Sequence, residues 1–438
     1  MALLARLYFF SKFVGVPFDR FVAFLQVKVL NNSSTASASR QKTALLKQEL
    51  KMDNANHPRA VSRLRIAQIA PLWERVPPPA YGGIELIVGL LCDELVRRGH
   101  EVTLFASGDS LSLARLEAVC PQALRLDPSV KECDIYQMLQ LSRVYEHAQD
   151  FDIIHSHIGC AALPYTNLVK TPTVHTLHGI FTPDNEKLFV HAQRQPYVSI
   201  SDAQRESRLN LNCVATVYNG IDTSIYDFQA QAEAPPYLAF LGRISPEKGP
   251  HLAIEIAQRS GWHLKMAGKV DAVDVEYFER EIKPHIDGKQ IEYLGEANHA
   301  QKCALMGGAV ATLFPITWRE PFGLVMIESM AVGTPVIALE LGSTREVIVH
   351  GQTGFLCHNV AEAVTAVEQA THLNRAACRE HVLANFSVQR MTDGYEAVYQ
   401  KILTERFAPN GHVQSLSRSG WVIPIVGKEA FNNGRFQS

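Results

Sequence analysis

The chain has 438 residues, of which 47% are apolar, and a formal net charge of −2 at pH 7. This length exceeds what one hydrophobic core usually supports, so we expect two domains. The near-neutral charge argues against nucleic acid as the main partner. The eight cysteines include no Cys-x-x-Cys pair. Their scatter favours reduced thiols in a cytosolic protein over a disulfide framework, and no zinc-type spacing of His or Cys is present.

The N-terminal segment differs in composition from the rest of the chain. Residues 1–51 carry eight Lys or Arg against two acidic residues, and the first thirty are rich in aromatic side chains. Charges interrupt each apolar run well short of the ~18 residues that a membrane-spanning helix needs. We interpret residues 1–61 as an N-terminal extension that is disordered or mis-started, with Met52 as the start of the functional chain. A basic and aromatic anchor at a membrane surface is the alternative.

Buried strands alternate with amphipathic helices after this extension. The first strand, 65–72, leads through a proline-rich loop to Gly82 and Gly83, and a helix over 85–99 follows. Further strands of this series are expected at 101–107, 151–157 and 171–179. Such alternation predicts a parallel sheet that binds its ligand at the carboxyl ends of the strands. We assign residues 62–230 to this first Rossmann-like domain.

Two features of the first domain involve histidine. His155 and His157 alternate along one strand, so their side chains share a face of the sheet. We interpret this pair as structural, because a metal site with two histidines would need further ligands nearby. His178 ends the next strand, directly before Gly179, on the side where a ligand is expected.

A second series of strands and helices forms the other half of the chain. Its strands are expected at 237–244, 262–268, 291–296, 311–316 and 334–339. We assign residues 231–386 to a second Rossmann-like domain, and residues 387–405 to a helix that crosses back to the first domain. The tail, 406–438, has no periodic pattern and is expected to be loosely ordered. The fold class is therefore α/β, with a cleft between two lobes, where ligands usually bind.

The strongest functional signal is a segment that contains Glu320 and Glu328. Between them, a glycine opens an apolar, helix-like run. The start of a helix offers unpaired backbone N–H groups to acceptor oxygens of a ligand, here those of Phe322, Gly323 and Leu324. The two carboxylates can in turn accept hydrogen bonds from hydroxyl groups. This combination suits a sugar nucleotide.

A second signal is a pair of cations, Arg243 and Lys248, in the strand-to-helix turn that begins at Gly242. Across this turn the two side chains can converge on one diphosphate, with helix amides behind them. Gly82 and Gly83 provide another place where the backbone can approach a ligand closely, or else form a plain tight turn. The glycine fingerprint of dinucleotide-binding proteins is absent, which disfavours a nicotinamide oxidoreductase.

Over residues 63–403 the chain resembles the family 4 glycosyltransferases. The motifs that carry the resemblance are YGGIE at 81–85, TLHG at 176–179, NGID at 219–222, GRISPEKG at 242–249 and REPFGLVMIE at 319–328. The segment that leads into YGGIE is similar to a bacterial subgroup that includes antibiotic-decorating sugar transferases. The resemblance implies a GT-B fold of two facing Rossmann-like domains. It also implies retention of the anomeric configuration, with no bound metal and no cofactor.

The resemblance further implies roles for individual residues. Glu320 and His178 would lie beside the donor sugar, whereas Glu328 would bond the ribose hydroxyls. Arg243 and Lys248 would hold the diphosphate, and the amides of residues 322–324 would meet sugar hydroxyls. One segment, at 342–355, departs from the family pattern. The family often has a proline directly before the residue at Glu346, and this chain has Arg345 there. This difference concerns the shape of the local loop.

These observations predict a hexosyltransferase with a donor of the UDP-glucose or GDP-mannose type. The acceptor hydroxyl would belong to a glycan, a lipid-linked molecule or a small molecule. We expect a cytoplasmic location, and contact with a membrane surface depends on the N-terminal extension. The alternatives are an enzyme similar to sugar-nucleotide epimerases and an inactive scaffold. A scaffold would be expected to have lost Glu320, Arg243 or Lys248, and all three are present.

Overall fold

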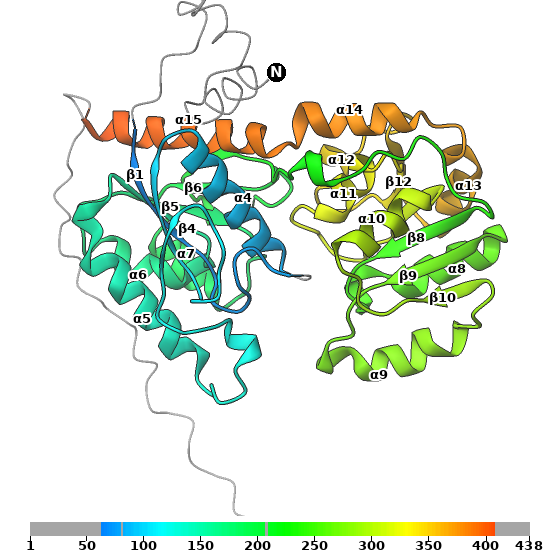
Figure 1. Cartoon of the computed structure of the whole chain (residues 1–438), viewed down its shortest axis with the longest axis horizontal. Helices are drawn as coiled ribbons and strands as arrows, with labels where there is room; N and C mark the ends of the chain where they lie inside the picture. The colour runs from blue at the N-terminus through cyan, green and yellow to red at the C-terminus, as the bar shows by residue number, and fades with distance from the viewer. Residues whose placement is uncertain (1–62, 80–81, 206–208, 408–438) are drawn as a thin grey trace, which may run out of the picture. The chain divides into compact units, whose positions relative to one another are not determined.

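The computed structural model describes residues 63–79, 82–205 and 209–407 (Figure 1). The predictions made for residues 1–61, and those for the tail beyond residue 407, lie outside this part of the chain. The described residues form two parallel β-sheets, each covered by helices, which confirms the predicted α/β fold class.

The first sheet has seven parallel strands in the order β3-β2-β1-β4-β5-β6-β7. Its strands are β1 (Arg65–Ile69), β2 (Glu101–Phe105), β3 (Arg115–Glu117), β4 (Ile153–Ser156), β5 (Thr173–Leu177), β6 (Tyr197–Ser199) and β7 (Cys213–Thr216). The helices of this half are α4 (Gly83–Arg97), α5 (Cys133–Glu146), α6 (Leu163–Thr166) and α7 (Asn185–His191). The central strands β4 and β5 are buried along their whole length, as expected for a parallel sheet with both faces covered.

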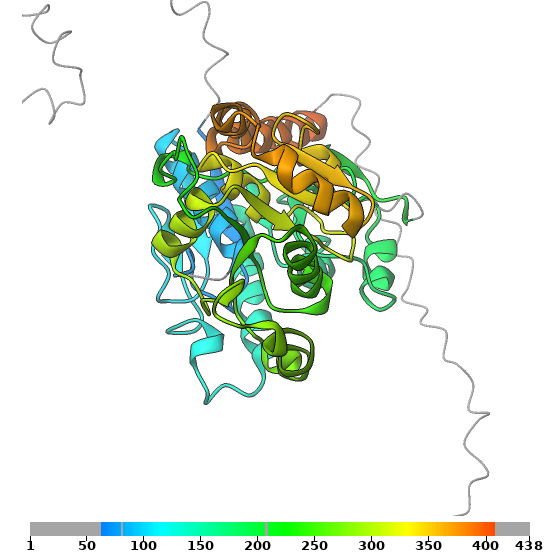
Figure 2. The same cartoon turned by 90° about the vertical axis from the view of Figure 1, so that its right-hand side faces the viewer.

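The second sheet has six parallel strands in the order β10-β9-β8-β11-β12-β13. Its strands are β8 (Tyr237–Leu241), β9 (His263–Ala267), β10 (Ile291–Tyr293), β11 (Ala311–Phe314), β12 (Val336–Leu339) and β13 (Gly354–Cys357). Its helices are α8 (Pro250–Ser260), α9 (Val275–Tyr277), α10 (His299–Gly308), α11 (Leu324–Ala331), α12 (Thr344–Val347), α13 (Val360–Ala370) and α14 (Arg375–Asn385). Helices α8 and α13 pack on one face, and α10, α11 and α14 on the other (Figures 1 and 2).

The last helix, α15 (Val388–Phe407), follows the second sheet in the chain but packs on the first (Figure 1). Its buried Tyr395 and Tyr399 share a hydrophobic cluster with Leu91 of α4. A polar contact supports this packing, because Glu396 accepts hydrogen bonds from Arg98 at 2.7 Å and pairs with a histidine ring at 2.9 Å. The predicted crossover helix is therefore present at the predicted position.

The structure also contains strands that the sequence pattern did not predict, namely β3, β6, β7 and β13. Each has three or four residues, and β3, β7 and β13 lie at sheet edges. Such short segments carry little periodic signal. Among the described residues, none of the helices combines the length and the hydropathy that crossing a membrane would require.

Candidate active site

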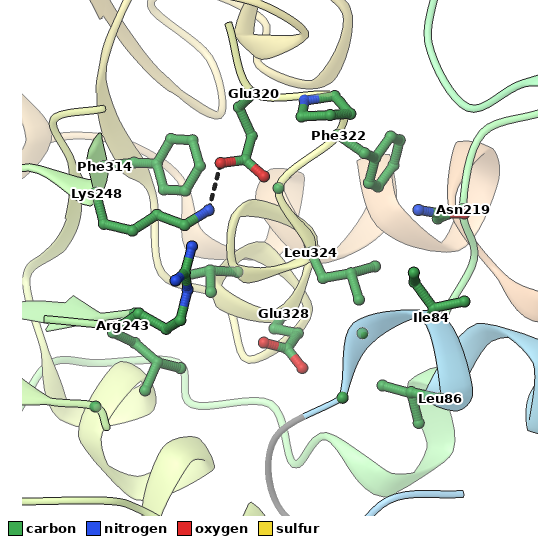
Figure 3. A pocket seen from close by; sticks show the side chains of 18 of the residues that line it. Ile84, Leu86, Asn219, Arg243, Lys248, Phe314, Glu320, Phe322, Leu324 and Glu328 are labelled. Atoms are coloured by element: carbon green, nitrogen blue, oxygen red, sulfur yellow. Dashed lines mark hydrogen bonds and ion pairs between the residues drawn. The ribbon is translucent and has the colours of Figure 1, made fainter. Parts of the chain in front are cut away.

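A cavity of about 370 Å³ lies at the carboxyl ends of strands from both sheets (Figure 3). All the site residues that the sequence singled out line this one cavity: Gly82, Gly83, His178, Gly242, Arg243, Lys248, Glu320, Phe322, Gly323, Leu324 and Glu328. Those of the second half converge because β8 and β11 are neighbouring parallel strands, whose following loops leave from the same edge of the second sheet. Gly82, Gly83 and His178 follow β1 and β5 of the first sheet. Segments more than two hundred residues apart in the chain thus contribute to one site.

Glu320 is held by two hydrogen-bond donors. Its Oε2 atom forms an ion pair with the Lys248 ammonium group and accepts a hydrogen bond of 2.8 Å from the Trp318 indole (Figure 3). The same ammonium group lies 5.1 Å from the centre of the indole ring, within range of a cation–π interaction. Within the described part of the chain, Oε1 of Glu320 has no hydrogen-bond partner. The carboxylate is therefore fixed in place with one oxygen available to a ligand.

The backbone around Glu320 is fixed by the turn at Gly342 and Ser343. Gly342 has a φ of 58°, and a Cβ atom there would lie 2.3 Å from the Glu320 carbonyl oxygen. Ser343 donates its backbone N–H to that carbonyl at 3.1 Å and its hydroxyl to the Phe322 carbonyl at 2.7 Å. Position 342 therefore requires glycine, and the turn fixes the position of the Glu320 backbone at the cavity.

Arg243 points into the same part of the cavity as Lys248 (Figure 3). Its guanidinium group is paired with acids, at 2.6 Å from Glu247 and 3.7 Å from Asp271. Asp271 also forms an ion pair of 2.6 Å with Lys269. A bound anion would therefore compete with two carboxylates for the arginine.

The start of α11 depends on Gly323. This residue has a φ of 79°, in the left-handed region, and a Cβ atom there would lie 2.7 Å from the Phe314 ring. The amide groups that follow it open the helix toward the cavity, where an anion or a hydroxyl oxygen is favoured by the helix dipole. Both the backbone conformation and the available space therefore require glycine.

We expect Gly323→Ala to destabilise the fold by on the order of 2–3 kcal/mol, because backbone strain adds to a steric clash. Gly351→Ala is the matched control: its φ of 75° is similar, but the added Cβ meets nothing within 4 Å. The control should cost roughly 1 kcal/mol from strain alone. Urea denaturation of both variants measures the difference, and equal losses would show that the contact with Phe314 has no effect.

Glu328 lies on α11 and is 4% exposed. Its Oε1 atom accepts hydrogen bonds from the Tyr226 hydroxyl at 3.0 Å and from the Lys302 ammonium at 3.3 Å. Burial, together with the neighbouring carboxylate, raises the pKa of Tyr226 well above its ordinary value, so the phenol stays a donor. Sequence reasoning missed both partners, since neither belongs to a motif and both are distant from Glu328 in the chain.

His178 follows β5 directly and is half-buried at the cavity wall. Its Nε2 atom lies 2.9 Å from Nδ1 of His157. Burial lowers the pKa of His178 to about 3, so the ring is neutral near pH 7. The rings of His155 and His157, a pair interpreted from the sequence as structural, have centres 4.0 Å apart and planes tilted by 40°. No group of three potential metal ligands occurs among the described residues.

Gly82 and Gly83 form the start of α4 at the cavity. Gly82 has a φ of 138°, and the side chain of Glu85 lies beside it, near enough to contact a Cβ atom added there. Glu85 is 5% exposed, and desolvation, with a smaller contribution from Glu74, raises its pKa to about 7. This carboxyl group therefore gains a proton on folding over a range of pH below neutrality.

This shift predicts a pH-dependent stability. The folded state binds the proton more tightly than the unfolded state, where the pKa is near 4.5. The stabilising contribution is therefore complete below about pH 4.5 and is lost as the pH rises through about 7, for a total on the order of 3 kcal/mol. Glu85→Gln should remove this slope. Urea denaturation across this range, compared between wild type and variant, tests it, and parallel curves would contradict the shift.

The departure at Arg345 leaves the adjacent glutamate in contact with the first half of the chain. Glu346 accepts hydrogen bonds from the backbone N–H groups of Asp202 and Ala203 at 2.7 and 2.8 Å. Arg345 itself is exposed and forms an ion pair with Glu340. Arg345 is not among the residues that line the cavity, and the contact made by Glu346 does not require a proline before it.

Comparison with known proteins identifies the family. Residues 81–225 match the model of Glycosyltransferase Family 4, and residues 223–381 match that of Glycosyl transferases group 1. The glycogen synthase of Mycobacterium tuberculosis is 27% identical over 57% of this chain and 68% of its own length. The N-acetyl-alpha-D-glucosaminyl L-malate synthase of Bacillus anthracis is 25% identical over 75% of this chain and 96% of its own.

Solved structures agree with this result. AviGT4, a glycosyltransferase involved in avilamycin A biosynthesis, superposes with a TM-score of 0.58 at 25% identity, covering 78% of this chain and 98% of its own. HepE of Anabaena, solved with UDP and glucose, gives a TM-score of 0.60 at 18% identity, covering 77% of this chain and 100% of its own, and so supports the fold. The chain belongs to the family 4 glycosyltransferases and has their GT-B fold.

Proposed function

We propose that this glycosyltransferase moves a hexosyl group from a nucleoside-diphosphate sugar to an acceptor hydroxyl, with retention of configuration and without a metal ion. The observation that supports the proposal most is the convergence of two cations, two carboxylates and a helix start on one cavity. A nucleotide sugar contains matching groups, namely a diphosphate, ribose hydroxyls and sugar hydroxyls.

In this proposal the diphosphate binds between Arg243 and Lys248. Breaking the glycosidic bond leaves negative charge on the departing phosphate, and fixed cations beside it would stabilise that charge. Arg243 would exchange its carboxylate partners for the phosphate. Because the two cations supply the positive charge, the reaction would need no metal.

The two glutamates take different parts of the donor. Glu328, held by Tyr226 and Lys302, would accept hydrogen bonds from the ribose hydroxyls. Glu320 would accept one from a sugar hydroxyl through Oε1, while Lys248 bridges its other oxygen and the phosphate. We favour attack of the acceptor on the face that the phosphate leaves, with the phosphate as base. A double displacement would instead require Glu320 as nucleophile.

The donor is proposed to be of the UDP-glucose or GDP-mannose type. HepE of Anabaena, which shares the fold, was solved with UDP and glucose. The acceptor would enter from the side of the first sheet and would be a glycan, a lipid-linked molecule or a small molecule. Its identity depends on loops of the first half of the chain.

The proposal is tested with a panel of UDP-glucose, UDP-galactose, UDP-GlcNAc, GDP-mannose and ADP-glucose. We expect one of these donors to bind and to be hydrolysed slowly, with release of its nucleoside diphosphate. Chelation of divalent metals with EDTA should leave both binding and hydrolysis unchanged. Binding of none of them would contradict the proposed donor class, and loss of hydrolysis on chelation would contradict metal independence.

A further inference from the structure

A chain of hydrogen bonds connects His178 at the cavity to the C-terminal helix α15. Its other members come from β1, β4, β5, the residue after β4, and α15. None of these is more than 1% exposed: Gln68, His155, His157, Thr176, Tyr395 and Tyr399. We call this group, together with His178, the buried polar chain. Polar side chains at such depth are normally bonded to one another with defined directions.

The half of the buried polar chain nearest the cavity runs from β5 to β1. His178 Nε2 lies 2.9 Å from His157 Nδ1, and His157 Nε2 lies 2.9 Å from Gln68 Oε1. The Gln68 amide nitrogen then donates to the Tyr399 hydroxyl at 3.1 Å. Each ring nitrogen of His157 therefore has one partner, and both ends of the Gln68 amide are used.

The other half runs back from α15 into the sheet. The Tyr399 hydroxyl lies 2.7 Å from His155 Nδ1, and His155 Nε2 lies 2.7 Å from the Thr176 hydroxyl. Thr176 donates in turn to the Tyr395 hydroxyl at 3.1 Å. Two tyrosines of the crossover helix are thus bonded to the same strands that end at the cavity.

The direction of these bonds is determined by the number of protons. A neutral histidine carries one ring proton, so it donates through one nitrogen and accepts through the other. Burial lowers the pKa of His155 and of His157 well below the usual range, and that of His178 to about 3, so the three rings are neutral. Fixing the direction of the bond between His157 and Gln68 therefore also fixes the direction of the bond between His157 and His178.

The Gln68 amide fixes this direction. Its oxygen accepts from His157 Nε2–H, so His157 Nδ1 has no proton and must accept from His178 Nε2–H. With the amide reversed, each proton would lie on the other partner, and His178 would present an N–H group at Nδ1. The orientation of one buried amide thus decides whether His178 Nδ1 is an acceptor or a donor.

We propose that Gln68 is a positioning residue that keeps the His178 proton on Nε2 and makes Nδ1 an acceptor for a ligand hydroxyl. In the described part of the chain, Nδ1 has no hydrogen-bond partner. An acceptor nitrogen attracts a hydroxyl and repels the oxygens of a phosphate. The group that binds beside His178 is therefore a hydroxyl of the transferred sugar, an assignment that rests on the proposed function.

The first test is neutron diffraction from deuterated crystals of the wild-type protein without ligand. It locates the exchangeable deuterium on His178 directly. Deuterium on Nε2, with Nδ1 bare, is the expected result, and deuterium on Nδ1 would overturn the proposal. This measurement involves no donor, so its outcome is independent of whether the proposed transferase activity is correct.

The second test uses Gln68→Met. The introduced thioether donates no hydrogen bond and accepts only weakly, so it does not hold the His157 proton on Nε2. We expect affinity for the donor sugar nucleotide found in the panel to fall roughly five- to tenfold, the loss of about one hydrogen bond.

The affinity for the free nucleoside diphosphate is the control, because its expected contacts lie on the second sheet. It should be unchanged in Gln68→Met, and the melting temperature shows whether the variant is folded. Parallel losses for diphosphate and sugar nucleotide would indicate a purely structural role and overturn the proposal, as would an unchanged affinity for the sugar nucleotide. If wild type binds no sugar nucleotide, the proposed function fails, and the neutron result still decides the direction of the chain.

Discussion

Glu320→Gln should lose most turnover and keep its affinity for the donor. The substitution removes the negative charge that pairs with Lys248 and leaves the shape of the side chain almost unchanged. A fixed charge that acts mainly in the transition state contributes on the order of a hundredfold or more to turnover. Single-turnover transfer and donor binding, measured on the same preparation, separate the two effects. Wild-type turnover in this variant would reject the role proposed for Glu320.

Glu328→Gln is the matched control, since it changes the other glutamate of the same segment. Glu328 is proposed to bind ribose, which takes no part in bond breaking. This variant should therefore bind the donor more weakly and retain turnover when the donor is saturating. Opposite patterns in the two variants would support separate roles for the glutamates. The same pattern in both would show that the segment acts as a single structural unit.

Arg243→Ala should weaken binding of the free nucleoside diphosphate roughly a hundredfold, equivalent to about 3 kcal/mol for a charged partner in a preorganised site. The arginine lines the cavity and is only partly exposed, so water compensates incompletely for its loss. Calorimetric titration with the diphosphate measures this directly and avoids any effect on chemistry. An unchanged affinity would exclude a diphosphate clamp at this position.

Glu247→Gln provides a control with the opposite expected sign. Glu247 accepts a hydrogen bond of 2.6 Å from Arg243, so it would compete with an incoming phosphate. Neutralising it should tighten diphosphate binding a few-fold, or roughly 0.5–1 kcal/mol for a partly exposed pair. Weaker binding in this variant would mean that Glu247 orients the arginine for the ligand.

Much of the fold followed from local patterns in the sequence. The apolar runs around Ile66, Phe240 and Leu313 are buried strands in the structure. The apolar face of α4 packs in the hydrophobic cluster that covers the first sheet. The pattern failed for β3 and β7, because short edge strands are defined by their pairing with a neighbour. Strand order also depends on which segments meet across long distances in the chain, and no local signal contains that information.

The same division applies to the cavity. Sequence motifs identified residues at the start of α11, such as Gly323 with its positive φ and Glu320 three residues before it. The motifs gave no indication of the partners of these residues. Tyr226 and Lys302 bond Glu328 from elsewhere in the chain, and Trp318, although within the segment, was not recognised as a donor to Glu320.

The sequence by itself determined the family, the α/β class and eleven of the residues that line the cavity, because these depend on local spacing and side-chain type. Only the tertiary structure decided which carboxylate pairs with which cation and how the buried polar chain directs the His178 proton. Hydrogen-bond direction and ion pairing depend on distances of a few ångströms between side chains far apart in the sequence. Gln68 lies 331 residues from Tyr399, and folding alone brings the two side chains together.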